Sequence, residues 1–179
     1  MSIQVFILSK LMVGKTYPYE LKKQMSEPIP LDELGGITES KLYYHFDALS
    51  KQGLIEPVEI IKEEHRPDKQ VFAITAKGRE ELPNKIYKLF KSANDLNDMV
   101  IALANIKYVD SEIVVTLLKE KLTNYKAHWE RIMNFDNTSP RDEKSENLND
   151  LLVGYFTTKS DHTIHWLEEA IRQIEQGNL

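Results

Sequence analysis

Residues Ile37–Gly53, with the sequence ITESKLYYHFDALSKQG, have the pattern of a short amphipathic helix. Leu42, Phe46 and Leu49 recur at i, i+4 and i+7, so they form one apolar stripe that must face a core. A helix with an apolar back and a face of hydroxyls, phenols and a lysine suits a DNA major groove, although an ordinary surface helix is also amphipathic. The residues on that polar face are Ser40, Lys41, Tyr43, Tyr44 and Asp47.

The two ends of this helix carry recognisable signals. Thr38 is the predicted N-cap, because its hydroxyl can accept a hydrogen bond from the free amides of the first turn. Gly53 is the predicted stop, because glycine adopts a left-handed backbone turn without steric cost.

A strand–turn–strand pattern follows the helix directly. Leu54–Lys62 is rich in β-branched residues and predicts a strand, and Gln70–Ile74 predicts the returning strand. The polar segment Glu63–Lys69 between them contains Pro67-Asp68, a turn signal. Thr75 then caps a further predicted helix. A helix followed directly by a β-hairpin is the arrangement of a winged helix-turn-helix domain, in which the hairpin is the wing.

The tip of this predicted wing is basic in part. His65, Arg66 and Lys69 could reach phosphates beside the groove that the helix enters. A hairpin tip of mixed charge that is merely solvated is the alternative interpretation.

Two predicted helices precede the polar-faced one. Ile3–Met12 has helical spacing and is apolar almost throughout, which indicates a buried helix. Lys15–Met25 predicts a second helix that starts near Pro18, a favoured first-turn residue. The order helix, helix, helix, hairpin, helix therefore occupies about the first 80 residues.

This order and several short motifs resemble the DNA-binding domain of the PadR family of bacterial transcriptional regulators. Tyr44 stands where the family has a proline, and His65 stands where a glycine commonly precedes the basic residue of the wing. A Trp166-Leu167-Glu168 element near the C-terminus resembles the long form of the family. The residues that match the N-terminal pattern are Gly14, Tyr19-Glu20-Leu21, Leu42-Tyr43, Leu49, Gly53-Leu54, Ile74-Thr75, Gly78 and Arg79.

The spacing of apolar residues in the second half of the chain predicts helices. A short helix around Leu96–Leu103 precedes a long one after Asp110, and the polar segment Phe135–Asn147 separates that helix from the last. Two long helices joined by a loop predict an antiparallel hairpin. Their wide apolar stripes favour cover by a symmetric second copy, with packing back onto the N-terminal domain as the alternative.

The expected fold is mainly α with a small β-hairpin: a winged helix-turn-helix domain at residues 1–82 and a helical dimerisation and effector domain at 83–179. We expect a cytoplasmic homodimer that binds a palindromic operator in double-stranded DNA, most simply as a repressor. The alternative is a winged-helix protein-interaction module without a DNA site. The residues expected to contact DNA are Thr38, Ser40, Lys41, Tyr43, Tyr44, Arg66 and Lys69.

A small-molecule effector is a further expectation, because some relatives in the family respond to phenolic acids or to cationic drugs. Four aromatic residues could line a pocket between the domains, although aromatics at helical spacing are more often plain core. These residues are Phe46, Trp129, Tyr155 and Trp166.

Composition excludes several other classes of function. The chain has 179 residues and a net charge of −5. It has no cysteine, which excludes disulfides and thiolate metal sites. No apolar run reaches membrane-spanning length. No phosphate loop, nucleophile elbow or paired-acid motif is present, so we expect no catalytic residues and no cofactor. His162 and His165 lack a further matched ligand, so no metal site is expected.

Overall fold

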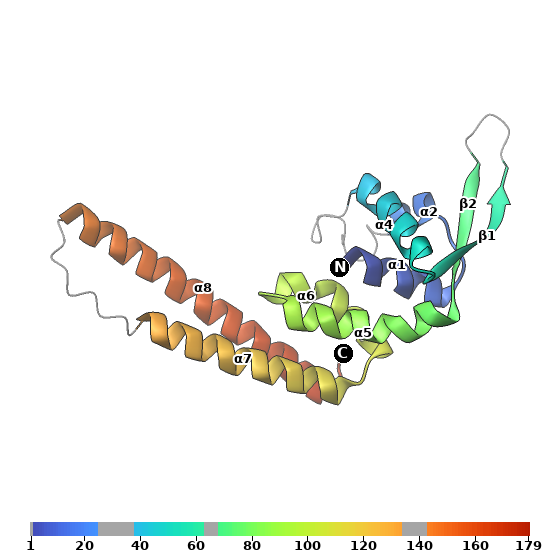
Figure 1. Ribbon diagram of the computed structural model, residues 1–179. Helices are drawn as coiled ribbons and strands as arrows, with labels where there is room; N and C mark the ends of the chain where they lie inside the picture. The colour runs from blue at the N-terminus through green and yellow to red at the C-terminus, as the bar shows by residue number, and fades with distance from the viewer. Residues whose placement is uncertain (1, 25–37, 63–67, 134–142) are drawn as a thin grey trace. The chain divides into compact units, whose positions relative to one another are not determined.

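The computed structural model of the protein describes residues 2–24, 38–62, 68–133 and 143–179. The fold is mainly helical with one two-stranded antiparallel hairpin, as predicted (Figure 1). The chain divides into two compact units, Met1–Asp110 and Ser111–Leu179.

The first unit is built around its N-terminal helix. Helix α1 contacts α4, α5, α6 and strand β2, which explains why it is apolar almost throughout. The elements of this unit are α1 (Ser2–Val13), α2 (Pro18–Gln24), α4 (Glu39–Lys51), β1 (Ile55–Ile61), β2 (Lys69–Ile74), α5 (Ala76–Ser92), α6 (Leu96–Leu103) and the 3-10 turn Ile106–Tyr108.

Helix α4 ends as predicted and begins differently. Gly53 has a φ of +69°, and the amides of Gly53 and Leu54 donate to the carbonyls of Ser50 and Leu49, which closes the helix in a Schellman motif. Thr38 occupies the N-cap position, but its side chain makes no capping hydrogen bond. The predicted hydroxyl cap is therefore wrong.

Strands β1 and β2 form the wing, which projects from the helices of the first unit (Figure 1). The wing is attached to the segment between α1 and α2 in two ways. Thr16 and Phe72 exchange backbone hydrogen bonds of 3.1 and 2.8 Å, and the Lys15 ammonium lies 2.6 Å from a carboxylate oxygen of Glu59 on β1. These contacts hold the base of the hairpin in one orientation.

Helix α5 is joined tightly to the end of α4. The Thr75 hydroxyl accepts a hydrogen bond from the Gly78 amide at 3.0 Å, which confirms the predicted cap, and it donates to the Gly53 carbonyl at 2.8 Å. Gly78 packs so closely that a Cβ there would collide with the backbone carbonyl of Leu54.

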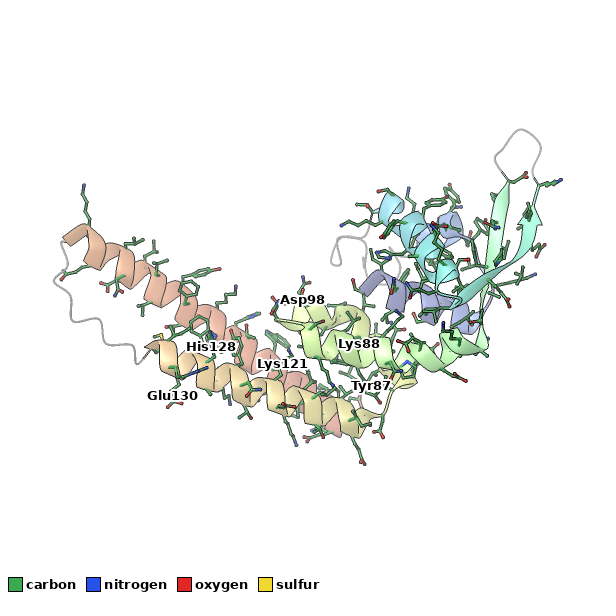
Figure 2. The ribbon with its side chains drawn as sticks, viewed as in Figure 1. Tyr87, Lys88, Asp98, Lys121, His128 and Glu130 are labelled. Atoms are coloured by element: carbon green, nitrogen blue, oxygen red, sulfur yellow. The ribbon has the colours of Figure 1, made fainter. Side chains whose placement is uncertain are left out.

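The predicted domain boundary, between residues 82 and 83, falls inside α5. Leu82, Ile86 and Phe90 on this helix are all buried, and α5 contacts α1 and α6. Helix α5 is therefore part of the core of the first unit and does not separate two units. The boundary between the two compact units lies after Asp110. Tyr87, labelled in Figure 2, anchors this end by accepting a hydrogen bond from the Asp110 amide at 2.9 Å.

The second unit is an antiparallel helical hairpin of α7 (Ser111–Met133) and α8 (Glu143–Glu175), which lie side by side (Figure 1). Two ion pairs of 2.6 Å, Lys119–Glu175 and Lys126–Glu168, join the helices. The buried apolar residues gather toward one end of the hairpin. These are Val114, Leu118, Leu167, Ala170, Ile171 and Ile174.

Neither long helix is apolar enough to cross a membrane, and the same holds for every other helix in the parts of the chain that the structure describes.

Candidate nucleic-acid interface

Helix α4 has two faces of opposite character. Leu42, Phe46 and Leu49 are buried in the first unit, which confirms the predicted core stripe. On the other face Tyr43 is 48% exposed and Tyr44 is 69% exposed. The structure thus places two partly exposed phenols on the outer surface of this helix.

The polar residues near the start of α4 share this outer surface. Thr38, Ser40 and Lys41 are exposed, and the hydroxyls of Thr38 and Ser40 lie 3.3 Å apart. A row of hydroxyls beside a lysine can donate to and accept from base edges and phosphates.

The end of the same face carries an ion pair. The Lys51 ammonium lies 2.7 Å from a carboxylate oxygen of Asp47, and both side chains are exposed. The hydrogen bond to Asp47 raises the pKa of Lys51. An acidic group beside Tyr43 makes this end less attractive to phosphate than the start of the helix.

His45 lies between the two faces. Burial lowers the pKa of His45, and the positive charge of Lys41, one turn earlier, lowers it further. The imidazole is therefore neutral at neutral pH and adds no phosphate-attracting charge to α4.

Of the three basic wing residues named from the sequence, Lys69 lies within the described residues. Arg66 and His65 lie outside the described residues. The ammonium of Lys69 lies 5.3 Å from the centre of the Tyr17 ring, on the first unit itself.

A groove of about 610 Å³ separates α4 from the wing. Phe46 and Phe72 line it, with ring centres 5.2 Å apart, and Pro57 pairs with Phe72 in the hairpin register. Tyr17 and Tyr19 contribute further rings from the start of α2. Sequence reasoning missed this groove, because its walls come from segments that are far apart in the chain.

The four aromatic residues predicted to line a ligand pocket lie in different units. Phe46 is in the core of the first unit, whereas Trp129, Tyr155 and Trp166 belong to the second. In the second unit, Phe156 joins Trp129 and Tyr155 into one cluster, with ring centres 5.6 and 5.1 Å from its own.

Histidines surround the aromatic residues of the second unit. His128, labelled in Figure 2, lies edge-on to Trp129, and His162 and His165 contact Trp166. Within the described ranges, no three histidine, aspartate or glutamate side chains gather in a way that could hold a metal ion.

Comparison with known proteins places the N-terminal residues in a family. Residues 7–84 match the model of the family described as "Transcriptional regulator PadR-like family". Comparison with curated proteins gives no match. Among solved structures, the chain is similar to a transcriptional regulator from Clostridium thermocellum, with 32% sequence identity over 48% of this chain and 79% of that one, and a TM-score of 0.41.

Two further similar structures are of PadR from Bacillus subtilis. The structure in complex with operator DNA has 18% identity over 97% of this chain and 99% of that one, with a TM-score of 0.42. The structure in complex with p-coumaric acid has 17% identity over 98% of this chain and 99% of that one, with a TM-score of 0.41.

Proposed function

We propose, because the chain belongs through residues 7–84 to the PadR-like family of transcriptional regulators, that it represses transcription by binding a palindromic operator as a homodimer. The family is one of regulators and not of enzymes. We place the protein in the cytoplasm, where bacterial DNA is accessible to it.

The observation that carries this proposal is the two-faced character of α4. Its leucine and phenylalanine side chains are buried, and Tyr43 and Tyr44 are directed to solvent. An α-helix fits the major groove, where phenol and hydroxyl groups can reach base edges. We therefore propose that α4 reads the sequence and that the wing contacts the adjacent backbone. The proposed contacts are Thr38, Ser40, Lys41, Tyr43 and Tyr44 on α4, with Arg66 and Lys69 on the wing.

The exposed apolar surface of the second unit supports dimerisation. Leu148, Leu151 and Leu152 on α8 are exposed, as is Phe156 one turn later. Exposed apolar stripes of this kind mark association surfaces, and two copies of one stripe cover each other in an isologous interface. Two copies of α4 held about one turn of DNA apart, about 34 Å, would read a palindromic pair of half-sites.

We also propose that a small aromatic or hydrophobic molecule relieves repression. The rings of Tyr155 and Trp166 support this, because both are exposed and each lies in a group of further rings.

The test of DNA binding is selection of fragments from a random duplex pool, followed by affinity measurements on the selected site. The selected DNA sites are expected to be two-fold symmetric. Tyr43→Ala should weaken specific binding about tenfold, and Lys41→Ala should weaken binding to all sequences and reduce the salt slope by about one. Lys88→Ala, which removes an exposed lysine of α5, is the matched control and should change neither quantity.

The alternative, an interaction module without a DNA site, draws support from the net charge of −5. It predicts that the parent protein does not bind duplex DNA at low salt, or that Lys41→Ala and Tyr43→Ala bind DNA as tightly as the parent does. Either result would replace the repressor proposal.

Dimerisation is tested separately by sedimentation. A stable monomer at micromolar concentration would contradict the dimer and, with it, the symmetric operator.

A further inference from the structure

We propose that Lys23 on helix α2, held in place by the ring of Tyr19, binds a DNA phosphate beside the reading helix α4. The contact would fix the register of α4 on the duplex, because phosphate contacts position a protein and base contacts specify the sequence. It rests on the proposed function and adds a contact on a helix from which none was expected.

Tyr19 and Lys23 lie on the same side of the first unit as the reading face. Helix α2 contacts α4 (Figure 1). Tyr19 lines the same groove as Tyr43 of α4, and its side chain is 45% exposed. Lys23 follows Tyr19 by four residues on α2, so the two side chains share one face of that helix. A duplex that is read by Tyr43 would therefore lie close to this face of α2.

The ammonium of Lys23 has a defined place on that face. It lies 5.1 Å from the centre of the Tyr19 ring, in a cation–π contact. A lysine side chain loses rotamer freedom when a ligand fixes it, and the ring already restricts this one. Because a ring face is not a carboxylate, N–H donors of the ammonium remain available to phosphate oxygens.

Other lysines near α4 and the wing already pair with carboxylates. The Lys51 ammonium lies 2.7 Å from Asp47, and the Lys15 ammonium lies 2.6 Å from Glu59. By contrast, Lys23 forms no ion pair within the part of the chain that the structure describes. Binding of this ammonium to a phosphate would release counterions from the DNA, which favours association.

The charge of α2 also favours phosphate. Its seven residues carry two lysines and one glutamate, a charge of +1 in a chain whose net charge is −5. The glutamate is Glu20, and its carboxylate accepts a hydrogen bond from the Tyr17 hydroxyl at 3.4 Å instead of pairing with Lys23. The exposed face of α2 is thus a locally basic part of an acidic protein.

The first test measures the salt dependence of binding to a short random-sequence duplex by fluorescence anisotropy. Lys23→Ala should make the slope of log affinity against log salt shallower by about one for each bound protomer. It should weaken random and selected duplexes by the same factor, about fivefold, because a phosphate contact carries no sequence information.

Lys107→Ala is the matched control for this test. Lys107 is also exposed, and its ammonium also lies 5.1 Å from a tyrosine ring, that of Tyr108, but on the turn that contacts α5. This variant should change neither slope nor affinity. An unchanged slope for Lys23→Ala, with Tyr43→Ala still weakening specific binding, would refute the phosphate contact and leave the proposed function standing.

Variants of Tyr19 test whether its ring positions the lysine. Tyr19→Phe keeps the ring and removes the hydroxyl, so it should bind DNA as the parent does. Tyr19→Leu removes the π-face while Lys23 keeps its charge, so affinity should fall about threefold with the salt slope unchanged. Equal losses in the two variants, or no loss in Tyr19→Leu, would overturn the positioning role. Far-ultraviolet circular dichroism checks that both variants are folded.

The last test locates the phosphate on operator DNA selected for the protein. Each phosphate is replaced in turn by a neutral methylphosphonate, and the parent and Lys23→Ala are titrated with every duplex. One replacement in each half-site should weaken the parent about fivefold and leave Lys23→Ala unaffected. Equal effects on both proteins at every position would refute the contact. A parent that binds neither random nor selected duplexes would refute the proposed function, and this contact with it.

Discussion

The two compact units differ in how far they bury apolar residues at helical spacing. In the first unit, α1 buries Val5, Ile7 and Leu8 completely among other helices. In the second, α8 leaves Leu151 69% exposed. Both segments have apolar residues at helical spacing. An apolar stripe therefore indicates that a face needs cover, but it does not indicate whether that cover comes from the same chain.

Among the tests of this comparison, Leu42→Ala in α4 is expected to have the largest effect on the free energy of unfolding. The leucine is fully buried, so its truncation should lower the free energy of unfolding by about 3 kcal/mol through lost burial and a residual cavity. Tyr44→Ala, on the exposed face of the same helix, should change it by less than about 0.5 kcal/mol. Urea unfolding followed by far-ultraviolet circular dichroism measures both. Equal losses would show that α4 has no outward face.

Gly78→Ala should produce the next largest effect, because the added methyl collides with the backbone of Leu54 rather than with a side chain that can move. A loss of about 2.5 kcal/mol is expected in the same unfolding measurement. Gly14→Ala is the control, since a Cβ there meets nothing within 4 Å. A neutral Gly78→Ala would mean that the junction of α4 and α5 is looser than described.

Leu151→Ser tests the second unit through association instead of folding. If α8 is covered by a second copy, loss of this side chain should weaken the dimer about 30-fold, or about 2 kcal/mol, with helix content unchanged. Analytical ultracentrifugation measures the dissociation constant. Val58→Ser removes an exposed apolar residue from β1 in the first unit and should leave association unaltered. An effect of Val58→Ser equal to that of Leu151→Ser would remove the distinction between the units.

The smallest predicted effect compares two threonines at helix starts within the first unit. Thr75→Ala should cost about 1 kcal/mol, since the hydroxyl caps α5 and also donates to Gly53. Thr38→Ala should cost no more than a few tenths of a kcal/mol, because Thr38 makes no capping hydrogen bond. Differential scanning calorimetry on both variants is the check, and a reversed order would contradict the assigned caps.

Local patterns could be predicted because each depends on residues close in sequence. The i, i+4, i+7 stripe of α4, the left-handed turn at Gly53 and the cap at Thr75 all follow from one short segment. The strands also agree within a residue or so of their ends, with Leu54–Lys62 predicted and Ile55–Ile61 observed.

Features assembled from distant segments could not be predicted in this way. The groove joins Tyr17 to Tyr43 and Phe72, which no sequence period connects. The boundary at residue 82 was placed where the order helix, helix, helix, hairpin, helix was taken to end, yet α5 continues to Ser92. Lys69 was expected to reach phosphate from its charge and its place in the predicted wing, and the tertiary structure adds that its ammonium lies near the Tyr17 ring.

The Schellman turn at Gly53 also joins the end of α4 to the start of α5. Leu54 follows it at once, and the Leu54 carbonyl accepts the Thr75 amide that leads into α5. Helix α4 is 13 residues long, or about 20 Å, and is clamped at this end. The far end of α4, which carries the proposed DNA contacts, is therefore placed by this junction and by the buried Leu42 together.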